Sequence, residues 1–176
     1  DISKIEAGKI EVFPQNIRLS ELIDDAVVSI EPQLKTKNLG LEISVPDELQ
    51  MHTDRKRLLQ CIINYLSNAV KYTETGTVKI EARQHDEKVQ ILVADTGIGI
   101  SKKDQATLFE AFERLDSKLR VKAGGTGLGL YLTRKIASEF LNGDVFMEST
   151  PGKGSTFGLI VPVRINTPNG CQSDEQ

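Results

Sequence analysis

The sequence lacks several features that mark specialised classes of protein. Its only two cysteines and two histidines form no recognisable pair and no metal-binding motif. No apolar run approaches the ~20 residues that cross a bilayer, and residues 1–9 lack the apolar core of a signal peptide. The net charge of −3 comes from mixed signs, unlike the basic surface of a nucleic-acid-binding protein. We therefore expect a cytoplasmic domain with reduced cysteines that contacts neither nucleic acid nor membrane.

The length and the 39% hydrophobic fraction fit one packed domain. Apolar residues at helical spacing predict a helix that Ser20 caps and that Pro32 kinks or ends. Similar patterns predict further helices over residues 54–72, 101–112 and 127–142, with Asp54 and Ser101 as caps. Residues 114–126 are predicted to be a mobile loop.

Alternation of apolar and polar residues predicts the strands. They cover residues 9–13, 39–45, 75–82, 88–94, 144–148 and 155–163. Pro14 is expected to end the first strand, and residues 85–87 are expected to join a hairpin. The mixed order predicts an α+β fold, a two-layer α/β sandwich whose mostly antiparallel sheet has helices on one face.

The helix over residues 54–72 has one polar arc, formed by Gln60, Asn64, Asn68 and Lys71. This arc can be read as a solvated helix face. Asparagine is a mediocre helix former, however, and its amide oxygen can bind Mg²⁺, while Lys71 can meet a phosphate. Both readings remain open on this helix alone.

Three glycine segments follow. Asp95 leaves a strand into the first, where its carboxylate could accept a hydrogen bond from the amine of adenine or simply belong to a turn. The second, residues 124–130, leads into a helix and favours phosphate binding over a plain loop. Its spacing does not fit a dinucleotide fold. The third, residues 152–157, lacks the P-loop pattern and reads by itself as a hairpin turn.

In order, these segments resemble the sequence boxes of sensor histidine kinases. The matches are the N box at residues 64–73 (NYLSNAVKYT), the first glycine box at 95–100 (DTGIGI), the F box at 108–114 (LFEAFER), the second glycine box at 125–130 (GTGLGL) and the last at 152–157 (GKGSTF). Residues 1–9 resemble the end of the dimerisation helix and its junction. Residues 10–163 then correspond to the ATP-binding catalytic domain, and residues 164–176 to a polar, disordered tail. Such kinases belong to the GHKL ATPases, with gyrase, chaperone and mismatch-repair relatives.

The resemblance implies ATP and Mg²⁺ as cofactors and assigns a role to each matching residue. Asp95 would bind the adenine amine, with Gly97, Gly99 and Ile100 in the same box and Thr156 nearby. Asn68 would hold Mg²⁺, and Asn64 would lie near the phosphates. Lys71 would contact phosphate, and Arg114 would stabilise the γ-phosphate. Tyr72 would help to enclose the nucleotide. The phosphate cradle and lid hinge would comprise Gly125, Thr126, Gly127, Leu128, Gly129 and Leu130.

The implied reaction transfers the γ-phosphoryl group of ATP to a histidine. No H-E-x-x-[TN]-P segment occurs, and neither His52 nor His85 has a suitable setting. The acceptor is therefore expected on a separate dimerisation domain of the same protein, and a response-regulator receiver domain is the expected next partner. The resemblance implies a homodimeric full-length protein, for which a membrane anchor is one of the arrangements left open.

Two alternatives remain. A GHKL ATPase could use hydrolysis for conformational work, but such relatives typically have Glu where this chain has Asn64. A domain that binds no nucleotide is disfavoured because every box looks intact.

Overall fold

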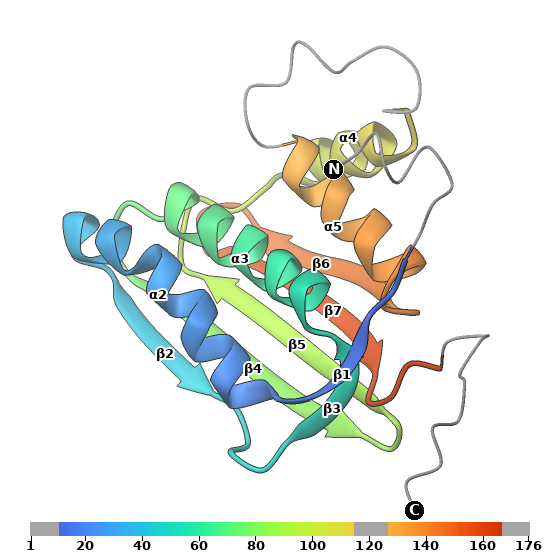
Figure 1. Cartoon of the computed structure of the whole chain (residues 1–176). Helices are drawn as coiled ribbons and strands as arrows, with labels where there is room; N and C mark the ends of the chain where they lie inside the picture. Colours follow the sequence, from blue (N-terminus) through green and yellow to red (C-terminus); the bar gives the residue numbers. More distant parts are fainter. Residues whose placement is uncertain (1–10, 115–126, 167–176) are drawn as a thin grey trace, which may run out of the picture.

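The computed structural model describes residues 11–114 and 127–166 of the chain (Figure 1). The elements in chain order are β1 (Pro14–Arg18), α2 (Leu19–Lys37), β2 (Gly40–Ser44), β3 (Gln50–Asp54), α3 (Arg55–Tyr72), β4 (Thr77–His85), β5 (Lys88–Asp95), α4 (Lys102–Arg114), α5 (Gly127–Glu139), β6 (Asp144–Thr150) and β7 (Gly154–Pro162). None of the helices within these residues is long and apolar enough to cross a membrane.

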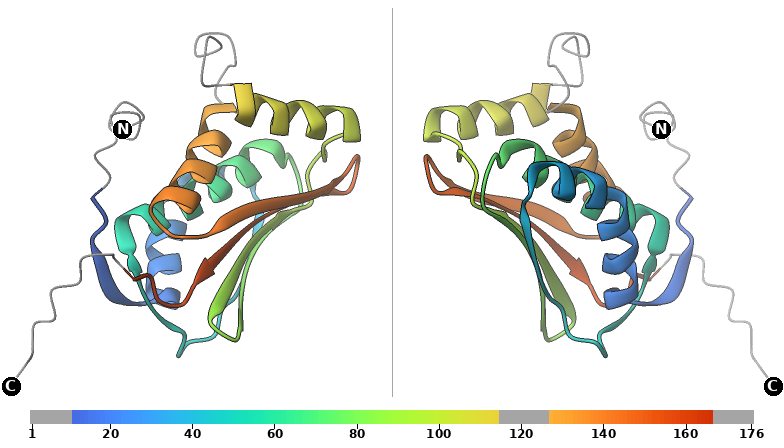
Figure 2. Two further views of the ribbon diagram at one scale, coloured as in Figure 1. Left: turned by 90° about the vertical axis from the view of Figure 1, so that its right-hand side faces the viewer. Right: turned by 90° about the vertical axis from the view of Figure 1, so that its left-hand side faces the viewer.

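Five strands form the main sheet in the order β2-β4-β5-β7-β6. The β2–β4 pair is parallel, and the other three pairs are antiparallel. Helices α2, α3 and α5 lie on one face of this sheet, and no helix of the described residues covers the other face (Figure 2). Strands β1 and β3 form a small separate antiparallel sheet. The predicted α+β sandwich is therefore confirmed.

The core lies between the helices and the covered face of the sheet. In β5, alternate side chains from Val89 to Asp95 are buried, and β7 alternates in the same way beside it. Helix α3 turns its apolar arc onto this surface. Tyr65 of that arc packs its ring against Phe157, with 5.6 Å between ring centroids, and its hydroxyl donates to the Gly158 carbonyl at 3.0 Å. This packing fixes α3 over the middle of the sheet.

Several local predictions are confirmed. Asp54 caps α3 by accepting the backbone N–H of Arg57 at 3.2 Å. Ser101 accepts the N–H of Asp104 at 3.1 Å and caps α4. The hairpin between β4 and β5 turns at Asp86, whose φ of 52° is a conformation that aspartate tolerates.

The prediction for the first strand and the start of the first helix is wrong. Pro14 begins β1 instead of ending a strand, since proline is tolerated at the first position of a strand. Helix α2 begins at Leu19, before the expected cap Ser20. Leu19 is fully buried, and its N–H donates to the Leu49 carbonyl at 2.9 Å. A tertiary contact therefore sets the start of the helix.

Helix α2 also continues past Pro32 to Lys37. Proline deprives the carbonyl one turn earlier, on Val28, of its helical donor. Val28 is 66% exposed, so water can satisfy that carbonyl. Buried Ile30 and Leu34 hold the turns on either side of the proline against the core.

The ordered domain extends beyond the expected boundary at residue 163. Ile165 is buried, and its N–H donates to the His52 carbonyl at 2.9 Å. The His52 N–H donates in turn to the Val163 carbonyl at 2.8 Å. These two bonds form one isolated parallel bridge between His52 of β3 and Arg164. Helix α5 ends at Glu139, earlier than expected, and α4 continues to Arg114, the residue at which the loop over residues 114–126 is expected to begin. The expected helix end and junction at residues 1–9, the rest of that loop and the tail from residue 167 lie outside the described residues.

Candidate nucleotide-binding site

Asp95 is the last residue of β5, the strand that pairs with β4 on one side and β7 on the other. It points to the helix-covered face and is 8% exposed. Burial raises the pKa of its carboxyl group, and hydrogen bonds from the backbone N–H groups of Gly97 and Ser155 oppose that rise. The result is a poorly hydrated carboxylate that can accept a hydrogen bond from a neutral donor such as an exocyclic amine.

The turn after Asp95 packs tightly against its neighbours. The Gly97 N–H donates to Asp95 Oδ1 at 2.9 Å, and a Cβ on Gly97 would overlap the Tyr72 carbonyl. Gly99 has a φ of 69°, and a Cβ there would overlap the Thr150 carbonyl. Close backbone approach therefore requires both glycines. The N–H of Ile98 also donates to the Tyr72 carbonyl at 3.4 Å, which joins this turn to the end of α3.

The polar arc of α3 lies next to helix α5. Asn64 donates through Nδ2 to the Thr133 hydroxyl at 3.3 Å, and that hydroxyl donates to the Gly129 carbonyl at 2.9 Å. Asn68 is half-buried one turn further along α3. Lys71 is exposed, and its ammonium group lies 5.6 Å from the centre of the Tyr72 ring. The Asn68 amide, the Lys71 ammonium group and the Tyr72 ring thus all belong to the last turns of α3, the end of the helix that contacts the Asp95 turn.

The structure describes the remaining predicted residues unevenly. Gly129 lies in the first turn of α5, with open space where a Cβ would be, and Leu130 is buried in the core. Leu130 can therefore offer only its backbone to a ligand. Arg114 ends α4, and Gly127 and Leu128 begin α5. Gly125 and Thr126 lie outside the described residues.

Thr156 does not hold the position expected beside Asp95. It pairs with Ala94, whereas Ser155 pairs with Asp95 and is 7% exposed. Successive side chains of a strand point to opposite faces, so Thr156 belongs to the uncovered face of the sheet and Ser155 to the site face. Counting back by two from buried Phe157 would have identified Ser155 from the sequence.

A second missed residue, Ser149, ties the Asp95 turn to the β6–β7 hairpin. Its hydroxyl accepts the N–H of Ile100 at 2.7 Å and lies 2.8 Å from the Ser155 hydroxyl. Gln105 of α4 donates to the carbonyls of Ile100 and Ser149 at 2.8 and 3.1 Å. These hydroxyl and amide groups hold the turn in place, and no sequence signal singled them out.

Comparison with known proteins agrees with this geometry. The model of a family described as "Histidine kinase-, DNA gyrase B-, and HSP90-like ATPase" matches residues 53–165, more than half of the chain. The chain belongs to this ATPase family. The match includes all of α3, the Asp95 turn and both strands of the last hairpin.

Curated relatives are larger sensor kinases. The circadian input-output histidine kinase CikA of Synechococcus elongatus is 41% identical over 170 residues, which cover 92% of this chain and 22% of that protein. The signal transduction histidine-protein kinase BarA of Escherichia coli K12 is 37% identical over 176 residues, covering 96% of this chain and 19% of that protein. The chain thus spans about a fifth of the length of the curated relatives it matches.

Solved structures give the same result. The catalytic domain of the histidine kinase ThkA, in a nucleotide-free form, matches with a TM-score of 0.74 and 27% identity, covering 87% of this chain and 97% of that chain. Full-length ShkA in complex with AMPPNP matches with a TM-score of 0.76 and 28% identity, covering 91% of this chain and 33% of that chain. This member of the ATPase family is therefore a catalytic domain of the histidine-kinase type.

Proposed function

We propose that this domain binds ATP with Mg²⁺ and transfers the γ-phosphoryl group to a histidine on a separate domain. The observation that carries the proposal is the buried carboxylate of Asp95 beside the end of α3, whose last turns present Asn68, Lys71 and Tyr72. One end of this arrangement suits an adenine base, and the other suits phosphates and a divalent cation. The membership in the ATPase family and the sensor-kinase relatives support the same reading.

Asp95 would select adenine. Its carboxylate can only accept hydrogen bonds when ionised, and adenine presents an exocyclic amine where guanine presents a carbonyl oxygen. With guanine bound, the buried Asp95 carboxylate would face a carbonyl oxygen, and neither acceptor would have a donor. This mismatch disfavours guanine strongly. Ser155, on the same face and in register with Asp95, would stand beside this contact.

The other end would receive the phosphates. Asn68 offers the kind of oxygen ligand that Mg²⁺ binds, with phosphate oxygens and water completing the usual coordination. Bound there, the ion would neutralise charge on the phosphates. Lys71 would contact phosphate, while the backbone of residues 125–130 and the Arg114 side chain would supply further donors in the family's arrangement. Tyr72 would help to enclose the base and sugar.

The chemistry at Asn64 favours transfer over hydrolysis. Its amide cannot remove a proton from water, and Nδ2 donates to the Thr133 hydroxyl. A hydrolase of this family would need a base at this position to activate water, and Asn64 cannot serve as one. ATP hydrolysis that drives conformational work is therefore only the second candidate function. We infer that the acceptor histidine lies on a dimerisation domain of the same protein. We further infer a homodimeric full-length kinase in the cytoplasm that passes the phosphoryl group to a receiver domain.

The phosphate assignment is tested by comparing two exposed lysines of α3. Lys71→Met should weaken binding of a non-hydrolysable ATP analogue with Mg²⁺ about 10-fold, and leave adenosine binding unchanged, because only a phosphate contact is lost. Lys56→Met, at the far end of the same helix, should change neither. Calorimetric titration measures both ligands. Equal binding by the two variants would remove Lys71 from the site.

Phosphoryl transfer needs its own assay. A separately purified dimerisation domain that carries a phosphoacceptor histidine is incubated with this domain and γ-labelled ATP. We expect acid-labile label on the added domain. Release of inorganic phosphate with no label on the acceptor would favour the hydrolase, and absence of nucleotide binding by the wild-type domain would refute the proposal altogether.

A further inference from the structure

The C-terminal end of α3 needs help from outside the helix. The last four carbonyls of any α-helix have no partner within it. At the end of α2, Asn38 has a left-handed backbone conformation, and its N–H donates to the carbonyls of Leu34 and Lys35. Helix α3 has no such residue, because Thr73 after its last turn is extended, with φ −109° and ψ 113°. Its carbonyls must therefore find donors elsewhere.

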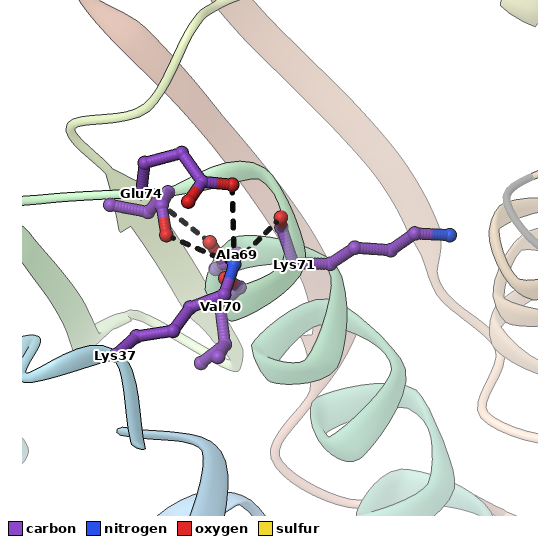
Figure 3. Close-up of polar contacts among 6 residues, drawn as sticks. Lys37, Ala69, Val70, Lys71 and Glu74 are labelled. Atoms are coloured by element: carbon purple, nitrogen blue, oxygen red, sulfur yellow. Dashed lines mark hydrogen bonds and ion pairs between the residues drawn. The ribbon is translucent and has the colours of Figure 1, made fainter. Parts of the chain in front are cut away.

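Lys37, the last residue of α2, supplies donors to two of these carbonyls and to the carbonyl of Thr73, the residue after the helix (Figure 3). Its ammonium group donates to the carbonyls of Val70 at 2.9 Å, Lys71 at 3.1 Å and Thr73 at 3.3 Å. An ammonium group carries three donors and no acceptor, so this set uses its full capacity. Its positive charge also lies at the negative end of the α3 dipole.

Two other contacts complete the cap. The Thr73 hydroxyl donates to the Ala69 carbonyl at 2.7 Å, and the N–H of Ile98 reaches the Tyr72 carbonyl. Every carbonyl from residue 69 to residue 73 thus has a donor. Lys37 also lies 3.7 Å from Glu74 Oε1, but the Glu74 side chain is 82% exposed, so the carbonyls dominate over this ion pair.

The same turn presents the proposed ligand contacts. Figure 3 shows the Lys71 side chain extending away from Lys37, although the Lys71 carbonyl accepts from it. The Lys37 side chain itself is 29% exposed and occupied with the helix end. Lys37 therefore fixes the backbone of the turn, while Lys71 and Tyr72 project from it.

We propose that Lys37 is a positioning residue of the nucleotide site. It acts through the last turn of α3, where it fixes the positions of Lys71 and Tyr72. It thereby also fixes the Tyr72 carbonyl, which accepts the Ile98 N–H and so holds the Asp95 turn. The inference rests on the proposed function, since it assumes that this turn contacts ATP. Lys37 itself would touch no ligand.

The test removes the donors of Lys37 and keeps its apolar stem. Lys37→Met should bind the ATP analogue with Mg²⁺ about 5- to 10-fold more weakly than wild type, since losing these hydrogen bonds loosens the turn. The Ile98 amide should exchange with deuterium faster in this variant, because its acceptor is the Tyr72 carbonyl. Lys37→Arg, which retains several donors, should restore most of both properties.

Two control variants separate positioning from general effects. Lys35→Met removes a neighbouring lysine whose side chain is 79% exposed and whose partner is Glu31, and it should bind within about twofold of wild type. Glu74→Gln removes the ion pair and leaves the carbonyl contacts, so it should also bind normally. If Lys37→Met fails to fold, Lys37→Leu, which also has no side-chain donor, replaces it in the same comparison.

The outcomes are distinguishable. Equal affinity and equal Ile98 exchange in Lys37→Met and wild type would overturn the inference and leave the proposed function intact. Loss of binding in Lys37→Met that Lys37→Arg does not restore would also overturn it, because a cap of carbonyls accepts either cation. Absence of nucleotide binding in the wild type would refute the proposed function and this inference with it.

Discussion

Replacing Asp95 with asparagine should separate affinity for adenine from stability. The Gly97 N–H donates to Asp95 Oδ1, and asparagine can keep that contact only through its amide oxygen. The NH₂ group of the asparagine would then face the amine of adenine, so that one donor meets another. The substitution preserves size and shape and reverses the hydrogen-bonding character of the atom that would meet the base.

The magnitude follows from two overlapping terms. A hydrogen bond to a charged acceptor contributes ~1.5–3 kcal/mol, and leaving a buried donor unsatisfied costs ~1–3 kcal/mol. Because both terms describe one contact, we expect a combined loss of about 2–4 kcal/mol, which is about 30-fold to 1,000-fold in the dissociation constant.

Stability should change in the opposite direction. Burial raises the pKa of Asp95 in the folded state, so its ionisation at neutral pH opposes folding. The asparagine variant should therefore be more stable at pH 7. The gain should disappear as the pH falls below the unfolded-state pKa of Asp95, where the wild-type carboxyl is protonated in both states.

Calorimetric titration with the ATP analogue measures the affinity, and urea unfolding at about pH 7 and about pH 3.5 measures the stability. Asp86→Asn is the matched control. Asp86 lies exposed in the turn of the β4–β5 hairpin, at the opposite end of β5 from Asp95, and its φ of 52° suits asparagine. Unchanged affinity in the Asp95 variant would refute the adenine contact. Lower stability of that variant at pH 7 would refute the argument from burial.

Two further predictions follow from buried polar groups. The affinity for the ATP analogue should fall on acidification at a higher pH than the ordinary pKa of aspartate implies, because protonated Asp95 can no longer serve as a charged acceptor. The Asp95→Asn variant should show only the pH dependence of the ligand, and identical profiles would contradict the assignment. Thr53 is fully buried, and its hydroxyl has no hydrogen-bond partner within the described structure. Thr53→Val should raise the free energy of unfolding by about 1 kcal/mol in urea titrations, and a decrease would indicate a partner for that hydroxyl.

The elements that the sequence predicts well are those whose signals are local. Helix α3 combines an apolar arc with a capping aspartate at Asp54, and both signals lie within the segment itself. Strand β5 alternates cleanly and ends at Asp95, which places that carboxylate on the covered face. The Asp95 turn and the polar arc of α3 could therefore be predicted, because they follow directly from these two elements.

The errors arise where distant residues decide. Helix α2 starts at Leu19 because of a bond to Leu49, not because of the Ser20 hydroxyl nearby. The choice between Ser155 and Thr156 is an exception, because the alternation within β7 itself places Ser155 on the same face as Phe157. Lys37 caps a helix 33 residues further along the chain, and no local pattern marks a lysine for that role.

Helix α3 links two parts of the site that are held in different ways. Its C-terminal end is fixed by Lys37 and by the N–H of Ile98, so the turn beside Asp95 has contacts on both sides. Further back, Asn64 joins α3 to α5 through one hydrogen bond between neutral groups, to the Thr133 hydroxyl. The buried Cys61 thiol of α3 makes a second contact with α5, to the Thr133 carbonyl at 3.9 Å, and Leu130 and Ile136 of α5 are buried in the core. In the proposed site, α3 would thus present its phosphate-binding residues between two elements that it contacts directly, the Asp95 turn and α5.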